Sequence, residues 1–205
     1  MSPFQELTDY RRRVAELYRG VREGGGNAHT HRWFVQERNA LFRGHSQSAL
    51  SPQQKQTFAG LSYFSYDPAL RLVLPVDTGV QTEVLEVELS QDGRVGLQRF
   101  GRIHFQLAGQ PQTLSLFWIL GYGGGIFLPF RDATGGAETY GGGRYVLDTI
   151  KHADLGQENG KLVVDFNFAY NPSCAYNPHW SCPLAPSENH LRLPIRAGER
   201  AFGSV

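Results

Sequence analysis

The sequence lacks a long apolar run, a strong charge of either sign and a recognisable secretion signal. No stretch approaches the roughly 18 apolar residues that a membrane-spanning helix needs, so we expect none. The segment MSPFQELTDYRRRVAELYRG is polar and periodic, unlike a secretory signal peptide, which favours a cytoplasmic location. The formal net charge is +1, without the basic surface of a nucleic-acid-binding protein. We therefore expect neither a membrane nor a nucleic acid as partner.

Cysteine and lysine are also scarce. The two cysteines, Cys174 and Cys182, are expected to be reduced thiols in a cytoplasmic protein. Arginine outnumbers lysine by 17 to 3, so most cationic groups are planar guanidinium groups that suit carboxylates and phosphates. The hydrophobic fraction of 40% is high enough for a packed core, which argues against disorder.

The first 60 residues have a helical pattern. Apolar side chains recur at intervals of three and four from Phe4 to Val21, which predicts a helix that ends at the glycines 24–26. A second helical segment is predicted near 30–42. Ser51-Pro52 is a helix start signal, with Ser as N-cap and Pro at the first helical position. A short third helix is expected to follow it and to stop by residue 60.

After residue 60 the pattern changes to short β-branched and aromatic runs. Strands are predicted at 70–76, 80–89, 95–100, 103–107, 114–120, 144–147, 162–168 and 191–195. Turns are predicted at Asp92-Gly93, at Gly109-Gln110-Pro111 and at Asn159-Gly160, the last of which is expected to join the strands at 144–147 and 162–168. No helical pattern separates the strands, so antiparallel pairing is expected. The predicted fold is mainly β (α+β), an antiparallel β-barrel or β-sandwich with two to three N-terminal helices. We expect one domain over 1–205, with the helical segment 1–60 packed on a β-rich core of 61–200.

The first candidate site is a glycine-rich hairpin. Nine of the 24 glycines lie between positions 121 and 143. Glycines permit close approach of a ligand to the backbone, and Arg131 and Arg144 could bind an anion through paired hydrogen bonds. No Gly-Lys-Ser/Thr or helix follows, so this is not a nucleotide-binding P-loop. The alternative is a structural hairpin in which Arg131 and Asp132 are partners and Thr134 helps to form the turn.

The second candidate is the segment that begins at Asp165. Read as a strand, it places Asp165 and Asn167 on one face and its aromatic side chains, including Tyr170, on the other. Buried polar groups need partners, and Arg144 or Arg131 is a natural counter-ion for Asp165. Asp165 is therefore either half of a structural ion pair, or a general base or ligand-orienting carboxylate.

The third candidate is a set of thiols and imidazoles, Cys174, His179, Cys182 and His190. Two cysteines and two histidines suit zinc, but the seven residues between the cysteines and the prolines among them do not fit the usual spacing. A reversible disulfide, a catalytic Cys174 with a histidine base, and buried structural thiols all remain open.

The residues of these segments resemble a known family. The runs FLPFRDATGGAETYGGGRY and VDFNFAYNPSCAYNPHWSCPLAPSENHLRLPIRAGE, with upstream Ser51-Pro52 and GLSYF, are similar to the bacterial and archaeal domain of unknown function 1684. The resemblance covers about residues 10–199. It implies no activity, but it marks positions in this sequence: Phe130, Asp132, Thr134, Gly135, Thr139, Tyr140, Gly143, Arg144, Tyr145, Asp165, Asn167, Tyr170, Asn171, Pro172, Cys174, Cys182, Pro183, Pro186, Asn189 and Glu199. His179 and His190 fall outside this pattern, which weakens the zinc and cysteine–histidine hypotheses.

The leading functional hypothesis is a pocket for a small anionic or polar ligand, formed by the 130–145 hairpin and the 165–174 segment. Its expected ligand-binding residues are Arg131, Asp132, Thr134, Tyr140, Arg144, Asp165, Asn167 and Tyr170. One alternative is an enzyme that uses Asp165 or Cys174 in the same pocket. Another is a structural or interaction protein without a small-molecule site. No metal site is predicted, and the residues leave the ligand, any cofactor and the oligomeric state open.

Overall fold

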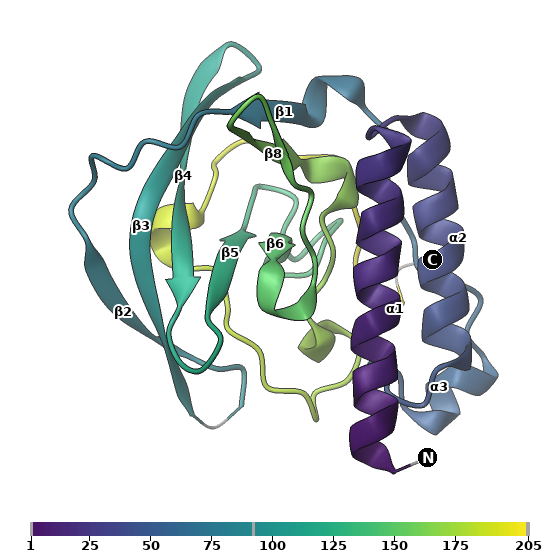
Figure 1. Cartoon of the computed structure of the whole chain (residues 1–205). Helices are drawn as coiled ribbons and strands as arrows, with labels where there is room; N and C mark the ends of the chain where they lie inside the picture. Colours follow the sequence, from purple (N-terminus) through teal and green to yellow (C-terminus); the bar gives the residue numbers. More distant parts are fainter. Residues whose placement is uncertain (1, 92, 204–205) are drawn as a thin grey trace.

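The computed structural model describes residues 2–91 and 93–203, and it begins with three helices (Figure 1). These are α1 (Pro3–Gly24), α2 (Ala28–Gly44) and the short α3 (Pro52–Gln56). The α3 helix starts as predicted: the Ser51 hydroxyl accepts a hydrogen bond from the Gln54 N–H, and the Gln54 side chain accepts one from the Ser51 N–H. The three predicted helical segments are therefore confirmed.

The strands form two antiparallel sheets. The larger sheet follows chain order, with β2 (Glu83–Glu88), β3 (Arg94–Leu107), β4 (Gln110–Ile119), β5 (Gly125–Phe130) and β6 (Arg144–Asp148). In the smaller sheet, β8 (Lys161–Asp165) lies between β1 (Arg71–Leu74) and β7 (Gln157–Glu158). The long helices α1 and α2 stand together on one side of these strands (Figure 1). The predicted fold class is confirmed as a sandwich-like α+β arrangement.

Short 3-10 helices and tight turns connect the strands. The 3-10 helices are η1 (Pro68–Leu70), η2 (Thr149–Lys151), η3 (Phe166–Phe168), η4 (Ser173–Ala175) and η5 (Ser187–Asn189). The predicted Asn159-Gly160 turn is present, because both residues have positive φ, 50° and 74°, as a two-residue hairpin requires. It joins β7 to β8, not β6 to β8 as expected. Gly109 forms the β3–β4 turn together with Ala108, and Asp92 of the other predicted turn lies outside the described residues.

Four of the predicted strands are wrong in detail. The two runs at 95–100 and 103–107 form one strand, β3, in which an irregularity between Arg99 and Gly101 shifts the register. The run 162–168 leaves the sheet at Asp165 and continues as η3, because the Asp165 carboxylate accepts the Asn167 N–H and holds a local turn. The run 191–195 is irregular in the described structure, and a bridge between Arg131 and His190 lies directly before it.

The core joins the helices to both sheets. Leu17, Tyr18 and Val21 of α1 and Phe34 of α2 belong to the same buried cluster as the strand residues. A second, smaller cluster surrounds Phe42 and includes Tyr176. Helix and loop side chains thus meet between these clusters, where the largely apolar pocket described below lies. Among the described helices, none is long and apolar enough to cross a membrane.

Candidate functional site

Arg144, which was expected to bind a ligand anion, is instead buried and makes hydrogen bonds within the protein. It is 1% exposed, and its Nη2 donates to Asp132 Oδ2 at 2.8 Å and to the Ile195 carbonyl at 2.9 Å. Its Nη1 donates to the carbonyls of Ala197 and Glu199. Burial lowers the pKa of Arg144, and the neighbouring Asp132 opposes that shift. Through these hydrogen bonds, Arg144 holds the irregular 195–199 segment against β6.

The other hairpin residues separate into different surroundings. Asp132 Oδ1 accepts hydrogen bonds from the Thr134 N–H, the Thr134 hydroxyl and the Ile195 N–H, so Asp132 and Thr134 are part of the internal network around Arg144. Arg131 is exposed on the surface. Tyr140 is half-buried, and its hydroxyl lies 3.6 Å from the Cys174 sulfur. Within the hairpin, Tyr140 thus contacts the Cys174 thiol, whereas Asp132 and Arg144 form the buried ion pair.

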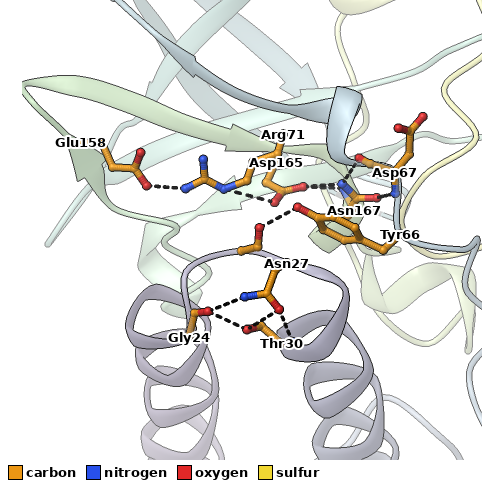
Figure 2. A network of polar contacts seen from close by, with 10 residues as sticks. Gly24, Asn27, Thr30, Tyr66, Asp67, Arg71, Glu158, Asp165 and Asn167 are labelled. Carbon is orange, nitrogen blue, oxygen red and sulfur yellow. Dashed lines mark hydrogen bonds and ion pairs between the residues drawn. The ribbon is translucent and has the colours of Figure 1, made fainter.

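Asp165 and Asn167 form a second internal network, shown in Figure 2. Asp165 Oδ1 accepts from the Asn167 N–H at 3.0 Å and from Asn167 Nδ2 at 2.8 Å. Asn167 in turn exchanges two hydrogen bonds of 2.8 Å with the backbone of Asp67. This network fastens η3 to the segment before β1.

The counter-ion of Asp165 is Arg71, not Arg131 or Arg144 as the sequence suggested. Arg71 Nε lies 3.9 Å from Asp165 Oδ2, and the Arg71 Nη2 pairs with Glu158 (Figure 2). Asp165 is 1% exposed, and its Oδ2 has no hydrogen-bond partner among the described residues. Burial raises the pKa of Asp165 to about 6. A cavity of about 110 Å³ adjoins this carboxylate, too small for most organic ligands.

A larger and mostly apolar pocket lies elsewhere, between α1, α2 and the loops that follow β6 and β8. Its volume is about 330 Å³. Its walls carry five tyrosines together with aliphatic side chains, one phenylalanine and one tryptophan: Leu7, Tyr10, Val14, Tyr18, Phe42, Ala49, Tyr145, Ala153, Tyr170, Pro172, Tyr176 and Trp180. Of the predicted ligand-binding residues, only Tyr170 lines it. A wider depression of about 850 Å³ on the outer faces of α1 and α2 is lined mainly by charged residues on the helix surfaces.

Arg38 contributes a cation to this apolar pocket. Its guanidinium carbon lies 4.7 Å from the centre of the Phe42 ring and 5.0 Å from that of Tyr170. Its Nη2 donates to Tyr176 Oη at 3.1 Å and to Glu199 Oε2 at 3.3 Å. Within the part of the chain that the structure describes, its buried Nε has no hydrogen-bond partner. Arg38 therefore retains donor capacity that the protein does not use.

The Tyr18 hydroxyl of the pocket is also without a hydrogen-bond partner among the described residues, and Tyr18 is 1% exposed. Burial raises the pKa of Tyr18 further above its ordinary value, so this hydroxyl stays protonated and can donate. By contrast, Tyr176 donates to Glu199 Oε1 at 2.6 Å, and Tyr145 donates to the Pro183 carbonyl. The pocket thus contains both satisfied and unsatisfied polar groups.

The charged residues that line the pocket are all cationic. Arg11 and Lys151 join Arg38, and no aspartate or glutamate lines the pocket within residues 2–91 and 93–203. Lys151 lies 4.0 Å from Asp148, whereas Arg11 has no ion-pair partner in the described part of the chain. Because Glu199 faces Arg38 and Asp148 faces Lys151, the surplus positive charge comes from Arg11. The pocket therefore favours an anion over a cation.

Sequence reasoning missed Arg38, Tyr10 and Tyr18. The two tyrosines belong to the apolar stripe of α1, and such a stripe predicts core packing without showing where the packing is incomplete. The sequence does contain an indication for Arg38. This cation lies four residues after Phe34 and three before Leu41, so it occupies a position on the apolar face of α2. A cation at such a position must find a buried partner, but the sequence does not identify Glu199.

The two cysteines lie at the edge of this pocket. Cys182 is buried and lines it, and Cys174 is half-buried in η4 next to the lining residue Ser173. Both are free thiols. His190 Nε2 lies 3.0 Å from the Ala185 carbonyl, and the described residues contain no group of three or more His, Cys, Asp or Glu that could hold a metal ion.

Comparisons with known proteins identify the family of the chain. A family model described as "Protein of unknown function (DUF1684)" matches residues 56–200. The solution NMR structure of an uncharacterised protein from Haloarcula marismortui is similar, with 33% identity and a TM-score of 0.58 over 85% of this chain and 94% of that one. No curated protein matches. The loop side of the pocket, from Tyr145 to Cys182, falls within the matched residues, and its α1 and α2 side precedes them. The chain therefore belongs to the DUF1684 family.

Proposed function

We propose that this protein binds a small amphipathic carboxylate in the tyrosine-lined pocket between α1, α2 and the C-terminal loops. The observation that carries the proposal is the buried Arg38 guanidinium, which lies against two aromatic rings of an apolar pocket and keeps an unused donor. A buried donor without an acceptor costs about 1–3 kcal/mol. A ligand oxygen that accepts a hydrogen bond there would recover that free energy on binding.

The lining also specifies the rest of the ligand. The aliphatic and aromatic side chains Leu7, Val14 and Phe42 suit a hydrocarbon or ring body rather than a sugar or nucleotide. The cation Arg11, which has no ion-pair partner among the described residues, favours a negative charge. At about 330 Å³ the pocket is at the lower end of the range of ligand sites, which fits a single ring or a short chain. An aromatic or short aliphatic carboxylic acid satisfies all three conditions.

The pocket differs from the one that the sequence suggested. Both use Tyr170, but the guanidinium is that of Arg38 instead of Arg144, and Asp165 belongs to a separate cavity. The enzyme alternative that uses Asp165 therefore forms no part of this proposal. The ligand class, a small anion, is retained.

The test is a binding titration with matched acid and amide probes. Benzoate and octanoate are compared with benzamide and octanamide by calorimetry, and backbone amide NMR shifts locate the site. We expect both acids to bind and to shift residues of 170–182 and of α1, and we expect the amides to bind at least several-fold more weakly. Lys151→Gln should weaken acid binding, whereas Lys161→Gln, an exposed lysine of β8, should not. Equal affinity for acids and amides, or shifts confined to the Asp165 cavity, would refute the proposal.

A further inference from the structure

The two thiols are held next to each other by a shared set of contacts. The Cys182 and Ser90 side chains lie beside the Cys174 sulfur and lower the pKa of Cys174, and the Tyr140 hydroxyl lies 3.6 Å from that sulfur. The same Ser90 hydroxyl accepts the Cys182 N–H at 3.0 Å, and the Ser90 N–H donates to the Cys182 carbonyl at 2.9 Å. Ser90 therefore fixes the backbone of one cysteine while it contacts the sulfur of the other.

The surroundings of the two sulfurs are unequal. Cys174 is half-buried, and the neighbouring side chains of Cys182, Ser90 and Tyr140, Cys182 most of all, lower the pKa of Cys174 to about 6. Cys182 is 1% exposed, and the neighbouring Cys174 sulfur, together with burial, raises the pKa of Cys182. At neutral pH the accessible sulfur is thus a thiolate, and the buried one is a thiol that faces it.

We propose that Cys174 and Cys182 are a redox-active dithiol, in which a hydroperoxide oxidises Cys174 and Cys182 then closes an intramolecular disulfide. The assignment of roles follows from position: Cys174 is the more exposed of the two, so an oxidant reaches it first, and the buried Cys182 lies beside it. The proposal is independent of any ligand in the pocket.

The chemistry balances in two steps with a hydroperoxide as the oxidant. The Cys174 thiolate attacks the terminal peroxide oxygen, so that an S–O bond forms, the O–O bond breaks and the leaving oxyanion takes up a proton. Cys174 is then a sulfenic acid. Cys182 next loses its proton and attacks the Cys174 sulfur, so that an S–S bond forms, the S–O bond breaks and hydroxide leaves as water. With hydrogen peroxide, two thiols and one peroxide give one disulfide and two waters.

A disulfide here would also change the pocket. Cys182 and Ser173 both line it, and Cys174 follows Ser173 directly. Formation of an S–S bond between the two sulfurs moves this part of the wall. Oxidation would therefore report on the pocket even if its ligand were different from the class proposed above.

The test uses the full chain with stoichiometric hydrogen peroxide at pH 7, followed by alkylation and peptide mass spectrometry. We expect a monomeric product with a 174–182 cross-link that dithiothreitol reverses. In Cys182→Ser we expect dimedone to label Cys174, and in Cys174→Ser we expect Cys182 to stay reduced. The proposal fails if both thiols remain alkylatable, if the disulfide links two chains, or if Cys182 is oxidised when Cys174 is absent.

The pH dependence of alkylation separates a reactive thiolate from a thiol that is merely accessible. The iodoacetamide rate of an ordinary thiol of pKa about 8.5 rises roughly 50-fold between pH 6.5 and 8.5, because its thiolate fraction rises by that factor. The Cys174 rate should rise less than about twofold in Cys182→Ser, in which a serine hydroxyl keeps a hydrogen-bond donor beside Cys174. Tyr140→Phe should steepen the profile, and Tyr122→Phe, a fully exposed tyrosine, should leave it unchanged. A 50-fold rise for Cys174 would overturn the proposed roles.

Discussion

Asp165 should make the folded protein lose stability as the pH rises from 4 to 7, and replacing it with asparagine should remove that loss. The pKa of Asp165 is raised from 3.8 to about 6, so the folded protein binds this proton more tightly than the unfolded chain does. Stability from this group is complete below the unfolded pKa and is lost as the pH passes through the folded pKa. About 2 pKa units correspond to about 3 kcal/mol, of which about 2 fall between pH 4.5 and pH 7. Because Asp165 is 1% exposed, solvent does not screen this term.

The measurement is the free energy of unfolding in urea at several pH values for the native protein and for Asp165→Asn. Taking the difference between the two proteins cancels the other carboxylates, which titrate in both. Asparagine keeps an oxygen for the two hydrogen bonds that Oδ1 accepts from Asn167. We expect the variant to gain about 2 kcal/mol relative to the native protein between pH 4.5 and pH 7. If the two proteins show the same dependence of the free energy of unfolding on pH, burial does not raise the pKa of Asp165 and the reasoning is refuted.

Three further predictions concern the buried contacts. Arg144→Met should lower the free energy of unfolding, measured in urea titrations, by about 3–5 kcal/mol, because it leaves the Asp132 carboxylate buried and unpaired. The control Arg192→Met, on the surface, should change the free energy of unfolding by less than about 0.5 kcal/mol. Equal effects of the two substitutions would contradict the Asp132–Arg144 pairing. Tyr18→Phe should leave the melting temperature unchanged or raise it, because the Tyr18 hydroxyl has no hydrogen-bond partner among the described residues. Tyr176→Phe should lower the free energy of unfolding by about 1–3 kcal/mol, because the Tyr176 hydroxyl has partners. The opposite order of stability would show that the Tyr18 hydroxyl is hydrogen-bonded. Gly198→Ala should destabilise the protein by more than Gly160→Ala. Both glycines have φ near 75°, but a methyl group at position 198 would lie 2.6 Å from the Ala169 carbonyl oxygen. Equal losses of stability would show that the backbone around residue 198 moves to accommodate the methyl group.

The local features of this fold are predictable from the sequence, because each depends on residues a few positions apart. Ser51 and Pro52 mark the start of α3, and Asn159-Gly160 closes a two-residue hairpin. The fold class follows from the same kind of evidence. The exit of the chain from the sheet at Asp165 is the exception, because a carboxylate that bonds to the N–H two residues ahead can replace a strand by a turn.

The pairing of buried charges is not predictable in this way. Asp132 and Arg144 were both identified, but as members of different possible pairs, and the partner of Asp165 proved to be Arg71. Arg38 and Glu199 are 161 positions apart and share no periodic pattern. The pocket lies where these long-range contacts leave helix and loop side chains incompletely packed. Its position therefore follows from tertiary geometry, even though Tyr170, one of its lining residues, was identified.

The segment 195–199 has a consequence for the order of events during synthesis. It supplies the acceptors for two buried guanidinium groups, of which Arg144 precedes Ala197 by 53 positions and Arg38 precedes Glu199 by 161. A ribosome makes both cations long before their acceptors, and neither can enter the core cheaply alone. The growing chain must therefore keep α2 and β6 partly hydrated until residue 199 has emerged. Folding of this protein is then completed by a late step that joins α2 and β6 to the 195–199 segment.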